Sequence, residues 1–531
     1  MSDTGLEKHS ESESESAPSD IDLLTLHEHR AGRLVIDPQE AKLELGEAVA
    51  VRLKLSADGT KVLWPQPTDS LLDPQNWSPT RKALQLFVIT LASIAPDFES
   101  GIGITAIFAL AEQYNTTPGE INNLTSNWSI FLIGQFCDYF SRPQSDSIFK
   151  TGWGGLFAVI LIRRYGRLPI LFWSQVLGLL FMLGATIAPN LNTFTAMRCL
   201  AGFFSSAPQV TGLYVVTDMY PFHLQARKLN VWTFGYIVSP FLSPFVFGFL
   251  VARTTWRWAY GIGTIYSAIV CLLIVIFGEE TMYDRGLKPI PEPPTTGLRY
   301  RVETLVGITG VKMTKYRDSW YKAIASPLRI VWRPQLIGIL FFEVTNAVFL
   351  GTPPPLGFGL SPFAVAGMYG TPIVAVFLGE VIGRYTNDWI MNFSIRRNAG
   401  VFEAESRLWA CYIAIPLYIC GFVVLGVSFQ NHLSVGGLIM GWGIAETATV
   451  AVLAYCSDSF PKHHGEIGAF FNLARVLGGF SVAYFQIPWA LKHGALQVYG
   501  VEAAIVAGLF LLVIPLLQLK GRMLRERFSV Q

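Results

Sequence analysis

The sequence predicts an all-α integral membrane protein in which twelve transmembrane helices form two halves of six helices each. The first observation is composition: 51% of the 531 residues are hydrophobic and only 15% are charged, whereas a soluble domain carries about 25% charged residues. The second is a series of apolar runs separated by polar loops. The third is a pair of short motifs that recur in the second half. These observations place the chain in the membrane class.

Twelve apolar runs account for the predicted spans, since a membrane-spanning helix needs about 20 mostly apolar residues. Ten of them have ordinary lengths and patterns, while the second is interrupted and the seventh is short. In order, the runs cover residues 84–111, 124–162, 168–188, 194–217, 231–252, 258–278, 336–351, 363–383, 408–429, 433–455, 467–490 and 502–519.

The loops between these runs differ in charge. Loops at 113–123, 189–193, 352–362 and 430–432 contain no Lys or Arg, whereas the alternate loops are basic, above all the segment 285–333. Basic loops remain in the cytoplasm, so both termini are predicted to be cytoplasmic. Three sequons in or near the first outer loop are candidate glycosylation sites: Asn115, Asn123 and Asn127.

The same pattern divides the chain into five parts. Polar sequence precedes the first run, and its stretch SESESESAPSD is typical of disorder; the weak alternation from Val49 to Leu55 is a minor strand candidate. The predicted parts are a largely disordered cytoplasmic tail (1–80), a six-helix half (81–278), a cytoplasmic central loop (279–335), a second six-helix half (336–519) and a cytoplasmic tail (520–531).

Two short motifs recur at equivalent positions in the halves. Asp218-Met-Tyr-Pro follows the fourth run and Asp458-Ser-Phe-Pro follows the tenth. Similarly, Tyr165-Gly-Arg follows the second run and Gly383-Arg-Tyr follows the eighth. Two parallel repeats of six spans are the arrangement of many secondary transporters.

Several local motifs resemble those of the major facilitator superfamily, within its fungal drug:proton-antiporter-like branch. They are Leu72-Asp-Pro-Gln-Asn-Trp-Ser before the first run, Trp256-Arg-Trp between the fifth and sixth runs, and Glu280-Thr-Met-Tyr after the sixth. Ser243-Pro-Phe-Val-Phe-Gly is a degenerate copy of the family's antiporter motif, Gly-Pro-x-x-Gly-Gly. The resemblance covers residues 72–528 and implies a twelve-helix transporter.

The family's loop between spans two and three usually contains Gly-x-Leu-Ala-Asp-Arg-x-Gly-Arg. In this chain the usual Asp is replaced by Arg163, a departure from the charge pairing generally attributed to that loop. The resemblance and the internal repeat assign a gating role to a set of loop residues: Arg164, Gly166, Arg167, Asp218, Arg384, Asp388 and Asp458.

Two acids lie near the centre of the first run, where a charge is costly and usually functional. Asp97 and Glu99 are about 200° apart around a regular helix, so only one can face a central cavity. We expect this to be Glu99, because it aligns best with the acidic position in the family's first span. Arg198, which matches the family's fourth-span Arg motif, is expected either to pair with a buried acid or to anchor the outer interface.

Further acids lie in the second half, and each is a candidate for substrate or proton coupling. Glu446 is flanked by small residues and suits a cavity, whereas Glu380 lies near the cytoplasmic end and suits a gate. Glu343 lies in the short seventh run. Buried carboxylates of this kind can exchange protons as a pocket opens and dries.

Two runs deviate from regular spans. Residues 135–151 contain two Asp, an Arg, a Pro and a Lys and cannot lie in lipid within a regular helix. The apolar part of the seventh run, 336–350, is only fifteen residues long. One hypothesis is a retained stretch at 135–151 and a missing stretch near residue 343 in the translated gene; the alternative is a real variant with a re-entrant insert and a compressed helix.

These features favour proton-coupled efflux of a small amphiphilic organic compound by a plasma-membrane protein. No phosphate-binding loop, metal-ligand cluster or nucleophile–base pair is found, so we expect no enzyme, no ATP-driven pump, no cofactor and no metal. The expected partners are substrate, protons and the lipid bilayer, without nucleic acid, and the chain is expected to be a monomer. The alternatives are a proton-coupled uptake symporter for a polar solute, a vacuolar location, or a non-transporting or degenerate membrane protein. Symport of a charged solute is disfavoured because Arg198 is the one basic residue that we identify within the spans.

Overall fold

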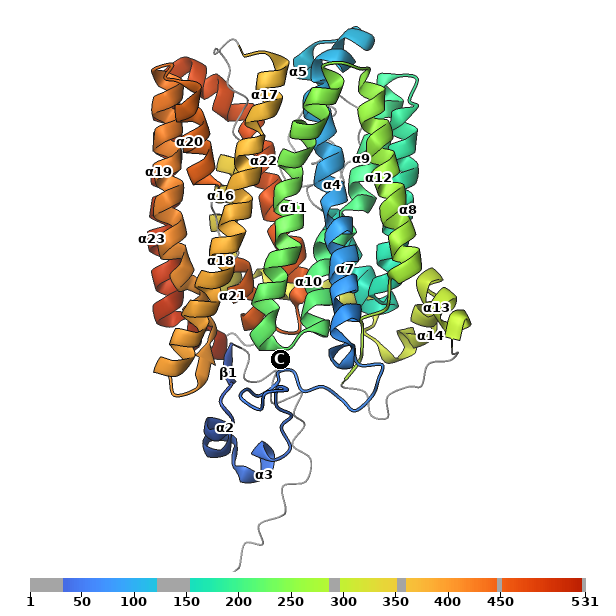
Figure 1. Cartoon of the computed structure of the whole chain (residues 1–531), viewed down its shortest axis with the longest axis vertical. Coiled ribbons are helices and arrows are strands. Elements are labelled where there is room, and N and C mark those ends of the chain that lie inside the picture. Colours follow the sequence, from blue (N-terminus) through green and yellow to red (C-terminus); the bar gives the residue numbers. More distant parts are fainter. Residues whose placement is uncertain (1–31, 122–152, 286–296, 351–359, 447–450, 528–531) are drawn as a thin grey trace, which may run out of the picture.

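The computed structural model describes residues 32–121, 153–285, 297–350, 360–446 and 451–527. It is an elongated bundle of long helices (Figure 1). Eight helices are long and apolar enough to cross a membrane, and shorter apolar helices accompany them. The described part of each of the twelve apolar runs falls on one or more helices in the predicted order. The all-α membrane fold is therefore confirmed, while the count of twelve spans stays a prediction.

The first half begins at α4, whose start is set by local chemistry. Ser78 caps the helix by accepting a hydrogen bond from the backbone of Arg81, and Pro79 occupies the first turn, where a missing N–H costs nothing. The fourth run is divided at Ser206 into α9 and α10. The helices are α4 (Pro79–Gln113), α5 (Pro118–Ile121), α7 (Trp153–Tyr165), α8 (Arg167–Thr186), α9 (Leu191–Ser205), α10 (Ala207–Met219), α11 (Phe222–Val251) and α12 (Trp256–Phe277).

The second half has the same overall plan with more divided helices. The short seventh run forms α16, and the predicted insert 135–151 lies outside the described residues. The elements are α16 (Pro334–Leu350), α17 (Pro362–Met368), α18 (Gly370–Arg397), β2 (Val401–Glu403), the 3-10 helix η4 (Ala404–Ala410), α19 (Cys411–Gln430), α20 (Val435–Ala445), α21 (Ala451–Ser459), α22 (His464–His493) and α23 (Ala495–Arg527).

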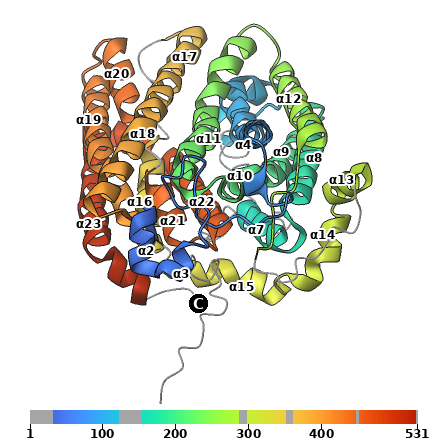
Figure 2. The ribbon, with the colours of Figure 1, turned by 60° about the horizontal axis from the view of Figure 1, so that its bottom comes forward.

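Short helices of the central loop lie along one edge of the bundle at one of its ends (Figure 2). Here α14 packs on α7, and α15 packs on both α7 and α22, so this loop contacts both halves. We call this end, where α7 terminates and β1 and β2 lie, the basic end. The central-loop elements are α13 (Gly297–Val306), α14 (Ile308–Met313), the 3-10 helix η3 (Thr314–Tyr316) and α15 (Trp320–Val331).

In the described structure the two halves meet along four main helix pairs: α11 with α18, α10 with α22, α11 with α17, and α7 with α22. Buried apolar side chains from both halves join one core; examples are Val210 and Leu213 on α10 with Ile467 and Phe470 on α22. A functional site built from both halves must lie along these contacts.

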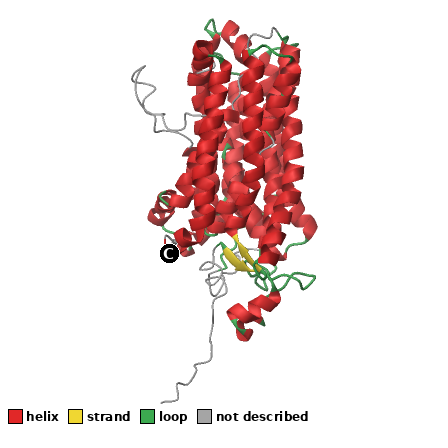
Figure 3. Ribbon diagram, turned by 90° about the vertical axis from the view of Figure 1, so that its left-hand side faces the viewer, coloured by secondary structure: helices red, strands yellow, loops and turns green. Residues whose placement is uncertain are grey.

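The chain before α4 is more ordered than we predicted. From residue 32 it forms β1 (Arg33–Val35), α2 (Pro38–Leu45), α3 (Glu47–Ala50) and the 3-10 helix η1 (Pro74–Asn76). β1 pairs antiparallel with β2, with Arg33 opposite Glu403, in the small sheet seen at the basic end (Figure 3). The predicted strand from Val49 to Leu55 is wrong, because α3 occupies its start and only a bridge from Leu55 to Val62 follows.

The reason for this order is a small set of well-placed apolar side chains in a polar segment. Trp64 is fully buried, and its indole Nε1 donates to the carbonyl of Val35 at 2.8 Å. The backbone N–H of Phe222 on α11 donates to the Trp64 carbonyl at 2.8 Å. Strand pairing attaches the segment to the second half, and Trp64 attaches it to the first.

Candidate functional site

An ion pair between the two halves lies at the centre of the candidate site. Asp97 on α4 accepts a hydrogen bond from Arg475 on α22, with Arg475 Nη2 and Asp97 Oδ2 2.7 Å apart. Gln209 on α10 donates to the same carboxylate oxygen at 2.8 Å. Both charged side chains are about four-fifths buried. In the described structure, one half contributes the acid and the other contributes the base.

Tyr236 on α11 extends this centre. The guanidinium of Arg475 lies over its ring at 5.4 Å from the centroid, a favourable cation–π geometry. The carboxylates of Glu343 on α16 and Glu380 on α18 are close enough to interact electrostatically with the same phenol. We call these five residues the central cluster: Asp97, Arg475, Tyr236, Glu343 and Glu380.

The structure reverses our expectation for the first-run acids. As helical geometry requires, Asp97 and Glu99 point in different directions, but Asp97 faces the second half. Glu99 is buried within the first half, where it accepts hydrogen bonds from Ser267 and, at 3.3 Å, from Ser205. α4 presents Asp97 to α10 and α22 and presents Glu99 to α9 and α12.

Arg198 also lies inside the first half. Its guanidinium donates to the backbone carbonyls of Glu99 at 2.7 Å and of Ser100 at 3.2 Å, and lies over the Tyr260 ring at 5.2 Å. Arg198 therefore lies beside Glu99 and contacts the backbone of this acid. Arg475 was missed in the sequence, even though it lies in the apolar run 467–490; the statement that Arg198 was the one basic residue within the spans is wrong.

The other predicted acids occupy different positions. Glu446 caps the C-terminus of α20, is buried, and accepts a hydrogen bond from Trp442 Nε1 at 3.2 Å. It therefore lies at the end of α20. Glu380 lies ten residues into α18 and belongs to the central cluster by its interaction with Tyr236.

At the basic end a second charged group joins the halves. Arg163 at the end of α7 forms a salt bridge with Glu466 in the first turn of α22, whose side chain is fully buried. Ser326 on α15 accepts from Arg163 Nη1 at 2.9 Å and donates to Glu466 Oε1 at 2.5 Å. Asp318, just before α15, pairs with Arg163 at 2.8 Å. We call these four residues the latch.

The predicted loop motif surrounds the latch. Arg167 forms a salt bridge with Asp218, and its guanidinium lies over the Tyr214 ring at 4.6 Å. Gly166 has a φ of 101°, a conformation that suits glycine and starts α8. Arg164 donates to the Asp318 carbonyl at 2.6 Å. Arg164, Gly166 and Arg167 were named from the sequence, whereas Glu466 and Ser326 were not.

The counterparts in the second half divide between two contacts. Asp388 on α18 pairs with Arg227 on α11 at 2.5 Å and thus joins the halves. Asp458 pairs with Arg407 at 2.9 Å within the second half. Arg384 is exposed on α18. Of the glycosylation candidates, Asn115 follows α4 with a φ of 49°, whereas Asn123 and Asn127 lie outside the described residues.

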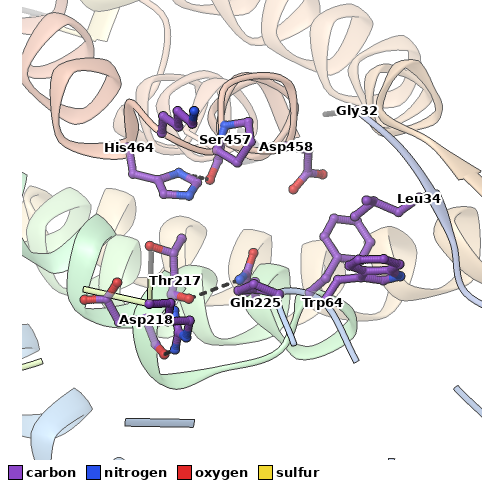
Figure 4. A pocket seen from close by; sticks show the side chains of 14 residues that line it. Gly32, Leu34, Trp64, Thr217, Asp218, Gln225, Ser457, Asp458 and His464 are labelled. Atoms are coloured by element: carbon purple, nitrogen blue, oxygen red, sulfur yellow. Dashed lines mark hydrogen bonds between the residues drawn. The ribbon is translucent and has the colours of Figure 1, made fainter. Parts of the chain in front are cut away.

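A small pocket of about 120 Å³ opens between the halves at the basic end (Figure 4). Asp218 and Asp458 line it from opposite halves, and Trp64 lines it from the N-terminal segment. Drug-sized ligands usually need about 300–1,000 Å³, so this pocket does not suit an organic substrate. Among the described residues, no group of His, Cys, Asp and Glu is placed to hold a metal ion.

Comparison with known proteins identifies the architecture. Residues 89–483 match the model of the Major Facilitator Superfamily. The efflux pump radE of Floropilus chiversii is 21% identical over 89% of this chain and 87% of its own length. The trichosetin biosynthesis cluster MFS transporter of Gibberella fujikuroi is 24% identical over 82% and 90%, respectively. The crystal structure of the human organic anion transporter MFSD10 (TETRAN) covers 83% of this chain and 100% of its own, with a TM-score of 0.52 at 15% identity.

Proposed function

The chain belongs to the Major Facilitator Superfamily, and we propose that it exports a small amphiphilic organic compound in exchange for protons. Membership makes it a multi-pass membrane transporter rather than an enzyme. The efflux direction is supported by relatives such as the efflux pump radE, and a secreted metabolite as substrate is supported by the relative from the trichosetin biosynthesis cluster.

The proposed orientation places the basic end in the cytoplasm. This end carries the loops rich in Arg and Lys, which the positive-inside rule retains on the cytoplasmic side. Plasma membrane is the proposed location. In this orientation, the latch and the pair Arg227–Asp388 close the cytoplasmic end of the path between the halves.

The observation that carries the proposal is the ion pair between Asp97 and Arg475. It joins helices from opposite halves, so these side chains must separate or rearrange when the halves move apart. A carboxylate that loses its charge by binding a proton also loses most of its attraction for a guanidinium. Protonation of Asp97 is therefore the proposed event that releases Arg475 and links proton movement to alternating access.

Glu343 and Glu380 give the released guanidinium other partners. Both acids belong to the second half, and both lie near the Tyr236 phenol over which Arg475 stacks. When Asp97 is protonated, Arg475 is expected to turn toward these acids without crossing to water. Substrate would occupy the same space, where the aromatic ring of Tyr236 offers an apolar contact.

A second candidate is proton-coupled uptake of an organic anion. It is favoured by Arg475, because a guanidinium at the interface between the halves can bind a carboxylate in two-point fashion. The two functions differ in which direction substrate moves when the proton gradient is imposed. Both require the Asp97–Arg475 pair.

The test is transport in inside-out vesicles with an imposed pH gradient. The probes are rhodamine 6G, an amphiphilic cation, and fluorescein, an amphiphilic anion. Asp97→Asn should abolish the dependence of probe transport on the pH gradient. Exchange of probe across the membrane in the absence of a gradient should be unchanged. Glu99→Gln, which changes a buried acid in the same helix, is the matched control. Gradient-dependent flux that is undiminished in Asp97→Asn would remove this acid from the mechanism. Movement of fluorescein in the direction opposite to that expected for efflux would favour uptake.

A further inference from the structure

The surface helix α15 has three distinct faces. At roughly 100° per residue, its buried side chains Ala323, Ser326 and Ile330 share one face, which packs on α7 and α22. A second, exposed face is apolar although nothing in the described protein covers it. It consists of Tyr321, Ile324, Leu328 and the adjoining Trp332, which are 77, 50, 60 and 76% exposed.

The third face is basic and lies beside the apolar one. Lys322 and Arg329 are both exposed and fall within about 20° of each other around the helix. A stripe of apolar side chains next to a stripe of Lys and Arg is the pattern of helices that lie in the membrane interface and bind anionic lipid. The position of α15 agrees, because it is on the rim of the bundle at the basic end and leads directly into α16 (Figure 2).

We propose that α15 is a binding surface for anionic phospholipid headgroups at the membrane boundary, and that lipid bound there keeps the latch closed. The apolar face enters the region between headgroups and acyl chains, and the basic face contacts phosphate and carboxylate groups. The proposed cytoplasmic orientation of the basic end puts this surface at the leaflet where anionic lipids gather. The inference does not depend on the transported substrate or on proton coupling.

The link to the latch follows from the buried face of the same helix. Ser326 contacts both Arg163 and Glu466, and Asp318 at the start of this segment also binds Arg163. Trp320 further fixes the end of α7, since the guanidinium of Arg164 lies over its ring at 4.6 Å. Holding α15 against lipid therefore holds two of the four latch residues in place.

The direct test is photo-crosslinking of the full-length protein in bilayers that contain equal trace amounts of photoactivatable phosphatidylserine and phosphatidylcholine. The ratio of the two crosslinked lipids is measured on the peptide 320–333 and, as an internal reference, on α12. We expect phosphatidylserine to be enriched on 320–333. Each Lys or Arg near an anionic surface contributes about fivefold in binding, so Lys322→Gln/Arg329→Gln should reduce the enrichment by roughly five- to thirtyfold.

The matched control is Lys42→Gln/Arg52→Gln, which removes two exposed charges from the N-terminal segment and should leave the ratio unchanged. Equal ratios on 320–333 and α12, or an enrichment that survives Lys322→Gln/Arg329→Gln, would overturn the lipid site. Ile324→Ser/Leu328→Ser should lower crosslinking of both lipids on this peptide, and unchanged crosslinking would show that the apolar face is not in the membrane.

The link to the latch has its own measurement. Amide hydrogen exchange at residues 463–467 and 161–165 is compared in phosphatidylcholine bilayers with and without phosphatidylserine. Phosphatidylserine should slow exchange at both segments several-fold in the native protein, and this effect should vanish in Lys322→Gln/Arg329→Gln. If hydrogen exchange in the native protein does not respond to phosphatidylserine, the link between lipid and the latch is refuted, but the proposed lipid-binding surface is not.

Discussion

Replacing Arg163 by Met is expected to open the basic end of the protein. The substitution leaves the Glu466 carboxylate fully buried without its cationic partner. Removing one member of a buried ion pair costs about 3–5 kcal/mol. Glu466 keeps hydrogen bonds from Ser326 at 2.5 Å and from Tyr214 at 3.2 Å, and the ring of His463 lies 3.4 Å from the same carboxylate. Because Arg163 itself is also 22% exposed, we expect a smaller cost of about 2–3 kcal/mol to the closed conformation. This corresponds to roughly 30- to 150-fold in the ratio of closed to open molecules.

The assay is a spin-label distance distribution between exposed residues of the two halves at the basic end. Val302 on α13, which packs on α8, and Arg396 on α18 are suitable exposed positions. In a background without the native cysteines, labels at these positions should report longer distances after Arg163→Met. The exposed Arg52→Met is the control and should leave the distribution unchanged.

A double variant separates charge from packing. Arg163→Met/Glu466→Met removes both charges and leaves no unpaired buried carboxylate, and such replacements are often neutral or stabilising. It should therefore recover much of the closed population that Arg163→Met loses. An unchanged distribution in Arg163→Met would refute the reasoning, as would a double variant that opens as far as the sum of the two single variants.

Two further predictions concern the N-terminal segment. Trp64→Ala removes a fully buried indole, and such truncations cost about 3–5 kcal/mol. The segment 33–78 should become sensitive to protease while α4 to α12 stay protected. Leu43→Ala, which changes an exposed side chain of the same segment, is the control. Burial raises the pKa of Asp73. This effect is outweighed by the hydrogen bond and charge of Arg285 and by the backbone N–H groups of Thr68 and Gln75, which together hold the pKa below 3.8. Docking of this segment should therefore be complete above pH about 4 and weaken as the pH falls below 3.8 through the lowered pKa. Protease sensitivity measured against pH checks this, and a profile unaltered by Asp73→Asn would contradict it.

The sequence predicted the bundle well because membrane spans leave a strong one-dimensional signal. Apolar runs, basic loops and capping residues such as Ser78 each act locally, so their positions could be deduced without a partner. The order before α4 could not be deduced in this way. β1 is three residues long and pairs with β2 more than 360 residues later, and composition alone does not reveal such a contact.

Site residues divided along the same line. The presence of an acid near the centre of the first run was visible, and so was the geometric rule that only one of Asp97 and Glu99 can face the second half. Which of them does so depends on how α4 is rotated against α10 and α22, and the sequence pattern of α4 contains buried residues on most sides. The partner Arg475 lies 378 residues away, and only tertiary structure brings the two charges together.

Arg163 shows why a departure from a family motif needs its spatial partner before it is interpreted. Where the family usually has Asp in this loop, an Arg would be expected to leave the basic end without its charge pair. In the structure the first turn of α22 supplies Glu466, and Asp318 supplies a second carboxylate from the segment before α15. The contact between the halves is thus kept with Arg as the first half's contribution, and the segment of α15 joins it as a third element. Because that element is an amphipathic surface helix, the substitution that first looked like a defect connects closure of the basic end to the composition of the membrane.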